Sequence, residues 1–103
     1  MEQATLFQLG KLALEEGDRG EARRRFSESS RISENLGDPV WIVHATFGKA
    51  LVAWEERLPR AAVEAATSAL EEARRLHIGL AAEIESWLAR TGQDGGADEL
   101  RGD

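Results

Sequence analysis

Apolar residues recur every three or four positions along most of the 103-residue chain, which is the spacing of an amphipathic α-helix. Glycine and proline separate five such segments, and no stretch shows the alternation typical of a strand. The pattern predicts five helices, near residues 3–16, 19–36, 39–56, 59–77 and 80–91. We therefore expect an all-α fold.

The predicted boundaries carry residues that commonly end or begin helices. Glycine often closes a helix, aspartate caps the next one, and proline fits the first helical turn. The boundary residues are Gly17, Asp18, Gly37, Asp38, Pro39, Pro59, Gly79 and Gly92. Glu21 follows Asp18 by three residues, which predicts a start similar to a capping box, with an acid at both ends.

Two of the predicted helices have informative apolar surfaces. Helix 39–56 is apolar nearly all round, so we expect it to be central and buried on several sides. Helix 80–91 has one apolar stripe, whereas its charged residues point away from that stripe, as in a terminal capping helix. The stripe consists of Leu80, Ile84, Trp87 and Leu88.

Identical residues recur at similar intervals in the two halves of the chain. The pairs are Ala22 and Ala62, Leu36 and Leu76, and Gly10 and Gly48. The first two pairs are 40 residues apart and the glycines 38, so we expect about two additional residues near positions 54–59. A period of 20–50 residues indicates stacked repeats. The glycines need a structural reason, because glycine inside a helix costs about 1 kcal/mol relative to alanine.

These residues resemble the tetratricopeptide repeat, whose first helix carries a Leu-Gly pair between bulky residues and whose second carries A-x3-F. The first copy matches through Leu6, Leu9, Gly10 and Ala13, with the turn at Gly17-Asp18, and then Ala22 and Phe26. The second copy has His44, Phe47, Gly48 and Leu51, then Ala62 and Ala66. The family's large aromatic residues are replaced by Leu6, Ala13, His44 and Leu51, and the late Gly37-Asp38-Pro39 break is similar to long-helix repeats of bacterial signalling regulators.

The resemblance implies two antiparallel helix hairpins and a C-terminal capping helix, stacked as a right-handed α-solenoid. The domain would span residues 1–92, with repeats at about 3–37 and 38–78 and the cap at 80–91. Residues 93–103 form a polar, glycine-rich segment that we expect to be disordered. The small Gly10 and Gly48 would let the two helices of each repeat pack backbone to backbone.

In this family the first helix of each repeat lines a concave groove that holds a peptide or helix of a partner. By position, the groove residues would be Ala4, Phe7, Lys11, Leu14 and Glu15 from the first copy and Ile42, Ala45, Lys49, Val52 and Glu56 from the second. Lys11 and Lys49 are the only lysines, and two cations in one groove would suit an acidic or carboxylate-ended ligand.

Composition narrows the function classes. The chain has no cysteine, which excludes a disulfide framework and a thiol nucleophile, and its net charge of −6 argues against nucleic acid as the main partner. An arginine-rich stretch at 19–31 keeps nucleic-acid binding as a minor alternative. His44 and His77 lack an acid or second histidine at helical spacing, so we expect no enzyme activity, metal or cofactor. No apolar run approaches about 18 residues, and the N-terminus lacks a signal pattern, so we expect a cytoplasmic location and no membrane partner.

The expected function is protein–protein interaction, as a scaffold or as the docking domain of a larger regulator. A small-molecule-sensing regulatory domain of a signalling protein is the alternative, which a pocket enclosed by polar groups would favour. The abundance of arginine over lysine is typical of a GC-rich bacterial source. We also expect a homodimer through the first helix, because Phe7 and Leu14 lie outside its core stripe and no preceding helix covers them.

Overall fold

The computed structural model describes residues 2–91, and the segment 93–103 lies outside that range. The helices are α1 (Gln3–Glu15), α2 (Arg19–Leu36), α3 (Pro39–Glu55), α4 (Pro59–Arg75) and α5 (Leu80–Thr91). Every predicted helix is present, and its ends agree with the prediction to within two residues. The all-α fold class is confirmed, since residues 2–91 contain no strand.

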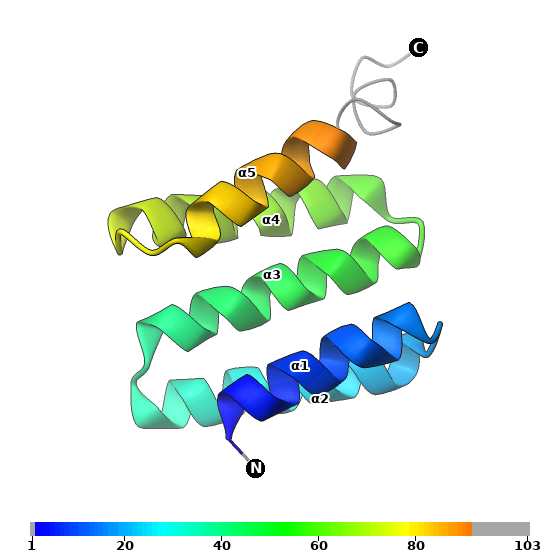
Figure 1. Ribbon diagram of the computed structural model, residues 1–103, viewed down its shortest axis with the longest axis horizontal. Helices are drawn as coiled ribbons and strands as arrows, with labels where there is room; N and C mark the ends of the chain where they lie inside the picture. The colour runs from blue at the N-terminus through cyan, green and yellow to red at the C-terminus, as the bar shows by residue number, and fades with distance from the viewer. Residues whose placement is uncertain (1, 92–103) are drawn as a thin grey trace.

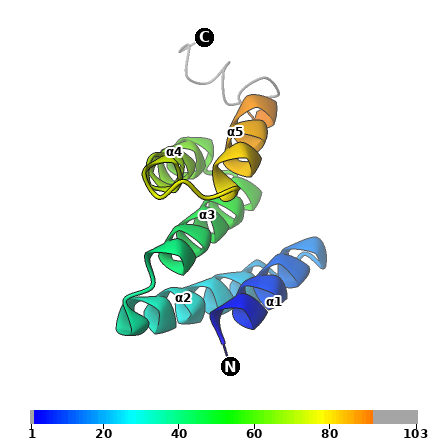
Figure 2. The ribbon, with the colours of Figure 1, turned by 60° about the vertical axis from the view of Figure 1, so that its left-hand side comes forward.

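The helices run back and forth, so that each is antiparallel to its neighbours in the chain (Figure 1). Helix α3 lies in the middle and contacts α1, α2 and α4, which confirms its predicted central position. Figure 2 shows that α1 and α5 flank α3 on one side of the molecule, while α2 and α4 lie on the other. The surface between α1 and α5 therefore has α3 as its base.

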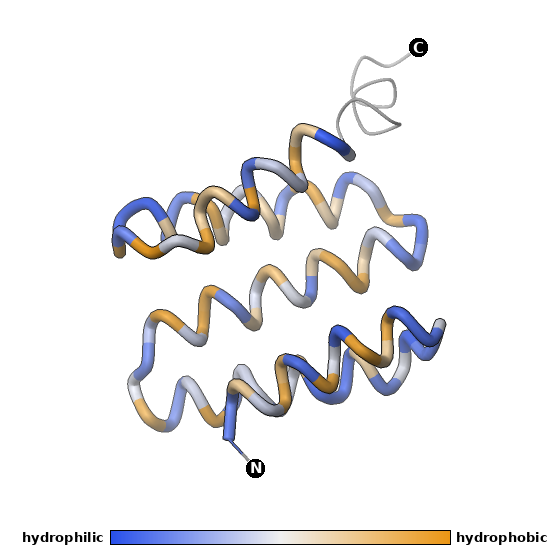
Figure 3. Tube along the Cα trace, in the orientation of Figure 1, coloured by the Kyte–Doolittle hydropathy of each residue, from blue (hydrophilic) through white to orange (hydrophobic). Residues whose placement is uncertain are grey.

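Apolar residues from these helices meet in two groups on either side of α3. One group joins α1, α2 and α3 around Phe7 and Phe26, and the other joins α3, α4 and α5 around Phe47 and Trp87. Figure 3 shows the corresponding alternation of hydrophobic and hydrophilic positions along each helix. Leu80, Ile84 and Trp87 of α5 are buried whereas its charged residues are exposed, as its single apolar stripe predicted.

Aspartate caps begin two of the helices, as predicted. The Asp18 carboxylate accepts a hydrogen bond from the Glu21 backbone N–H at 3.0 Å, and the Asp38 carboxylate accepts one from Trp41 at 3.3 Å. Glu21 does not complete a capping box. Its carboxylate instead pairs with Arg24 at 2.8 Å and Arg25 at 3.0 Å, and the hydrogen bond from Arg24 is the main reason that the pKa of Glu21 is lowered.

The turns that end the helices recur at an interval of 40 residues. Gly17 and Arg57 have φ values of 81° and 62°, and Gly37 and His77 have φ values of 65° and 57°. The backbone hydrogen bonds recur at the same interval, because the N–H of Asp18 donates to Ala13 at 2.8 Å and that of Leu58 donates to Ala53 at 3.0 Å. The expected insertion of two residues is therefore wrong.

Gly48 is consequently not the positional counterpart of Gly10, since Ala50 follows Gly10 by 40 residues. The two glycines instead share a neighbour, because both lie against the Phe26 ring of α2. A β-carbon at either glycine would lie 2.6 Å from an atom of that ring. The glycines thus make room for an aromatic side chain, and not for the backbone-to-backbone contact within each repeat that we expected.

Candidate functional site

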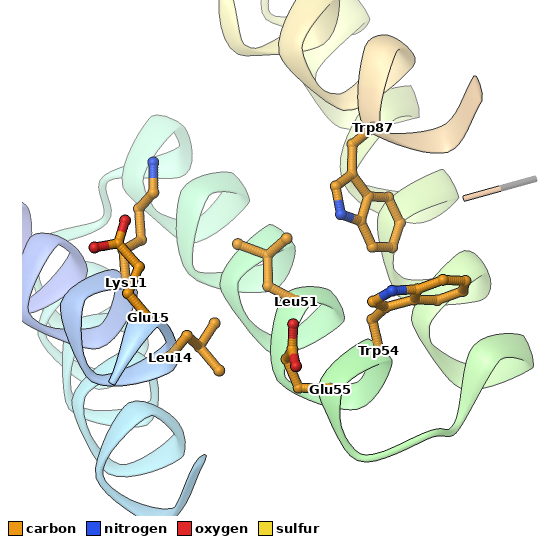
Figure 4. A pocket seen from close by; sticks show the side chains of 7 residues that line it. All are labelled: Lys11, Leu14, Glu15, Leu51, Trp54, Glu55 and Trp87. Carbon is orange, nitrogen blue, oxygen red and sulfur yellow. The ribbon is translucent and has the colours of Figure 1, made fainter. Parts of the chain in front are cut away.

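A hollow of about 180 Å³ lies on the surface between α1 and α5, above α3 (Figure 4). Its lining comes from three helices that are not consecutive in the chain: Lys11, Leu14 and Glu15 from α1, Leu51, Trp54 and Glu55 from α3, and Trp87 from α5. We name this surface the α1–α3–α5 groove. Because the three helices are held by the packing beneath them, the groove is built on rigid elements.

The base of the groove is apolar and well supported. Leu14, Leu51 and Trp54 are half-buried, and Trp87 is only 8% exposed. The Trp54 and Trp87 rings meet edge to face with centroids 5.8 Å apart, and Trp87 makes a similar contact with Phe47 at 5.7 Å. These aromatic contacts fix both indoles at one end of the groove.

The indole nitrogens of Trp54 and Trp87 lie on the side of their rings that faces Leu51 (Figure 4). Neither N–H donates a hydrogen bond to another group in the described part of the chain. Both N–H groups reach the surface, because His44 Nδ1 is the one buried side-chain nitrogen or oxygen without a partner in the described residues. The two donors can therefore serve the carbonyl oxygens of a molecule that enters the groove.

The rim of the groove carries two carboxylates and one ammonium group. Glu15 and Glu55 are exposed, and neither forms an ion pair within residues 2–91. Arg19 approaches Glu55 but donates to its backbone oxygen, at 3.1 Å, and leaves the carboxylate free. Lys11 is half-buried, and its Nζ lies 5.6 Å from the centroid of the Phe7 ring.

The predicted groove residues do not share one surface. Lys11, Leu14 and Glu15 line the α1–α3–α5 groove, whereas Lys49, Val52 and Glu56 line a separate hollow with Arg23 of α2. Phe7 is 4% exposed, Ala45 is fully buried, and Ala4 and Ile42 are half-buried and line neither hollow. In the second hollow Arg23 and Glu56 form an ion pair.

The misplacement has a simple cause. Four of the five second-copy residues follow their first-copy counterparts by the glycine interval of 38, and Glu56 follows Glu15 by 41, whereas the turns recur at 40. With the interval of 40, Leu51 and Glu55 follow Lys11 and Glu15, and Trp54 follows Leu14. The Ala22–Ala62 interval was the signal that could have identified them. Lys11 and Lys49 consequently lie in different hollows, so the argument for one acidic ligand held by both lysines fails.

Phe7 is covered by its own chain, which corrects the premise of the expected dimer. Its ring contacts Phe26, Trp41 and His44, with centroid distances of 5.5, 5.9 and 5.3 Å. Helices α2 and α3 therefore bury the side chain that we expected to be uncovered. The dimer itself stays a prediction, and the exposed leucine of α1 is Leu12, at 49%.

His44 is held in an aromatic environment at the other end of α3. Its imidazole stacks on Trp41 at 4.3 Å, and its Nδ1 is buried without a hydrogen-bond partner. Burial lowers the pKa of His44, and the charges of Glu83, Lys11 and Asp38 act on it more weakly. His77 instead adopts the left-handed conformation that ends α4. The two histidines occupy separate structural positions and do not form one site.

The described residues form neither a metal site nor a membrane span. Residues 2–91 contain no group of three or more histidine, aspartate or glutamate side chains able to hold a metal ion. No described helix is both long and apolar enough to cross a membrane.

Comparison of the chain with family models, curated proteins and solved structures gives no match.

Proposed function

We propose that the chain is a helical-repeat module, similar to the tetratricopeptide repeat, that binds a peptide or helix of a protein partner in the α1–α3–α5 groove. The observation that carries the proposal is the groove itself, where three non-consecutive helices surround an apolar base with free hydrogen-bonding groups at its edge. Such a module would act as a scaffold or as a docking domain of a regulator.

The interval of 40 residues supports the repeat part of the proposal. The turns, the backbone hydrogen bonds that close them and the starts of α2 and α4 recur at this spacing, and α5 begins 41 residues after α3. In stacked repeats the corresponding helices of successive units line one surface. Helices α1, α3 and α5 are the corresponding helices here, and they are the ones that line the groove.

The size and lining of the groove favour a peptide over a small molecule. Sites for drug-sized ligands are typically clefts of about 300–1,000 Å³ that enclose most of the ligand. The hollow of about 180 Å³ is smaller and suits the side chains of a longer segment. An amphipathic helix or an extended peptide can place apolar anchors on Leu14, Leu51 and Trp54 while the rest of it stays outside.

The test uses a displayed library of random peptides, selected for binding to the full chain. Selected peptides are then titrated against Leu14→Glu, which places a charge in the groove, and against Leu36→Glu as the matched control. Leu36 is 67% exposed at the end of α2, and it is not one of the residues that line the groove. Circular dichroism establishes that both variants retain their helices, and tryptophan fluorescence reports a change around the three tryptophans, of which Trp54 and Trp87 line the groove.

The proposal predicts peptides that bind the parent and Leu36→Glu and lose at least tenfold in affinity for Leu14→Glu. A shift in tryptophan fluorescence should accompany binding. Selection of no peptide would contradict the proposal. Peptides that bind Leu14→Glu as well as the parent would also contradict it, because another surface would then be responsible.

A further inference from the structure

We infer that the segment bound in the α1–α3–α5 groove is cationic, carrying lysine or arginine beside an aliphatic anchor residue. This inference rests on the proposed function and names the chemistry of the partner. The sign of the partner's charge is opposite to that of the acidic ligand expected from the sequence. The inference follows from a comparison of the charged groups of the groove that have a partner with those that have none.

The two carboxylates of the rim are free. Glu15 and Glu55 are both exposed and form no ion pair within residues 2–91, although many arginines lie on the neighbouring α2. Arg19 donates to the backbone oxygen of Glu55, at 3.1 Å, and not to its carboxylate, and three other arginines of α2 pair with carboxylates outside the groove. Arg24 and Arg25 pair with Glu21, and Arg23 pairs with Glu56 in the second hollow. Within residues 2–91, no guanidinium forms an ion pair with the carboxylates of the groove.

Lys11 does not balance these two carboxylates. It is one cation against two anions, and its ammonium lies near the face of the Phe7 ring, 5.6 Å from the centroid. A cation over an aromatic ring is already partly stabilised by that ring. Lys49, the only other lysine, lines the second hollow. The rim thus keeps an excess negative charge.

The arrangement of groups in Figure 4 fits a long cationic side chain. Glu55 rises from α3 next to Leu51 and Trp54, and Glu15 lies across the groove on α1. The methylene groups of lysine or arginine pack on apolar surface while the charged head reaches polar groups. Leu14 and Trp54 offer that surface, and the carboxylates offer the acceptors. An acidic segment would instead meet uncompensated like charge.

The experiment compares two synthetic helical peptides built on alanine. Both carry leucines at i, i+4 and i+7, with lysines in one peptide and glutamates at the same positions in the other. Affinities for the full chain are measured by tryptophan fluorescence and calorimetry at about 0.05 M and about 0.5 M NaCl. The key variant is the double Glu15→Gln and Glu55→Gln. Its matched control is Glu64→Gln with Glu71→Gln, which removes the same charge from exposed α4 positions.

The lysine peptide should bind about tenfold tighter than the glutamate peptide at low salt, because two partly exposed ion pairs contribute about this much together. The advantage should shrink at high salt and vanish in the Glu15→Gln and Glu55→Gln double variant, while the α4 control retains it. Equal affinities for both peptides, tighter binding of the glutamate peptide, or no binding of either overturns the inference. The proposed function fails separately, if the random library yields no groove-binding peptide.

Discussion

Gly10 and Gly48 come from different helices yet lie against the same side chain, the ring of Phe26. A β-carbon at Gly10 would lie 2.6 Å from Cε1 of that ring, and one at Gly48 would lie 2.6 Å from Cδ1. Phe26 is fully buried, so a displaced ring would have to move its neighbours in the core. The packing of α1 and α3 on α2 therefore depends on the absence of side chains at both glycines.

Replacing either glycine by alanine should destabilise the fold. The gain in helix propensity is about 1 kcal/mol, whereas overpacking a core typically costs about 1–3 kcal/mol, so we expect a net loss or no gain. Chemical denaturation of Gly10→Ala and Gly48→Ala measures the effect. Gly20→Ala is the control, because Gly20 has no ring beside it and its variant should gain stability. Increased stability of Gly10→Ala and Gly48→Ala, equal to that of Gly20→Ala, would contradict the packing account.

Arg57 and His77 hold the left-handed conformation that glycine holds at Gly17 and Gly37. This conformation costs an L-residue about 1–2 kcal/mol, and part of that is offset by the extra entropy of glycine in the unfolded chain. Arg57→Gly and His77→Gly should therefore each stabilise by about 0.5–1 kcal/mol, a rise in Tm of roughly 3–6 °C.

The reciprocal variants provide the control for the turns. Gly17→Ala and Gly37→Ala should lower the Tm, although a β-carbon at either position would meet no atom within 4 Å. The decrease in Tm of these two variants would therefore report the cost of the backbone conformation alone. Unchanged melting in both pairs of variants would show that the left-handed turns carry no strain in solution.

Leu58 occupies the N-cap of α4 without a side-chain hydrogen bond, 40 residues after the capping Asp18. Leu58→Asp should provide an acceptor for a backbone N–H of the first turn and stabilise by about 0.5–2 kcal/mol. Leu58 is 52% exposed, so little buried surface is lost. Thermal melting relative to Leu58→Ala, which removes the leucine and adds no cap, isolates the contribution of the cap.

His44 should make stability depend on pH. Burial lowers its pKa below the unfolded value of 6.5, so between these two values the unfolded chain binds more protons than the folded one. Stability should therefore fall as the pH drops through 6.5 toward the lower pKa. Nearby charges oppose one another, since Glu83 and Asp38 raise the pKa and Lys11 lowers it.

Urea unfolding at pH 7.5 and 6.0 measures the dependence. His44→Phe keeps a ring against Trp41 and should lose the dependence in this range, whereas His77→Gln, which changes an exposed histidine, should retain it. The same slope in the parent and in His44→Phe would assign the dependence to other groups.

The helices could be predicted from sequence because their ends are local. Gly37, Asp38 and Pro39 each act on the backbone within a few residues, and the structure ends α2 and begins α3 at these positions. Helix α3 was predicted to be central because its apolar residues cover nearly every direction around the helix. Both predictions depend on spacing along one segment, which the sequence contains in full.

The relation between the two halves was harder to predict, because it depends on backbone conformation. Arg57 adopts the conformation of Gly17 without being glycine, so residue type concealed the equivalence. Gly48 is the same residue type as Gly10, but it packs against the Phe26 ring from another helix. The glycine interval places Lys49 and Val52 in the predicted groove, two residues before Leu51 and Trp54, and a shift of two residues turns a helical side chain to a different face.

Charge reversal at the two lysines distinguishes the two intervals directly. If the groove followed the interval of 38, Lys11→Glu and Lys49→Glu would alter binding of a selected peptide equally. In the structure only Lys11 lines the α1–α3–α5 groove, and Lys49 lies in the hollow beside Arg23. We therefore expect Lys49→Glu to leave the affinity unchanged. Lys11→Glu should tighten binding of the lysine peptide several-fold at low salt, because it adds a third carboxylate to the rim. Calorimetry at two salt concentrations measures both effects, and an equal response of the two variants would restore the interval of 38.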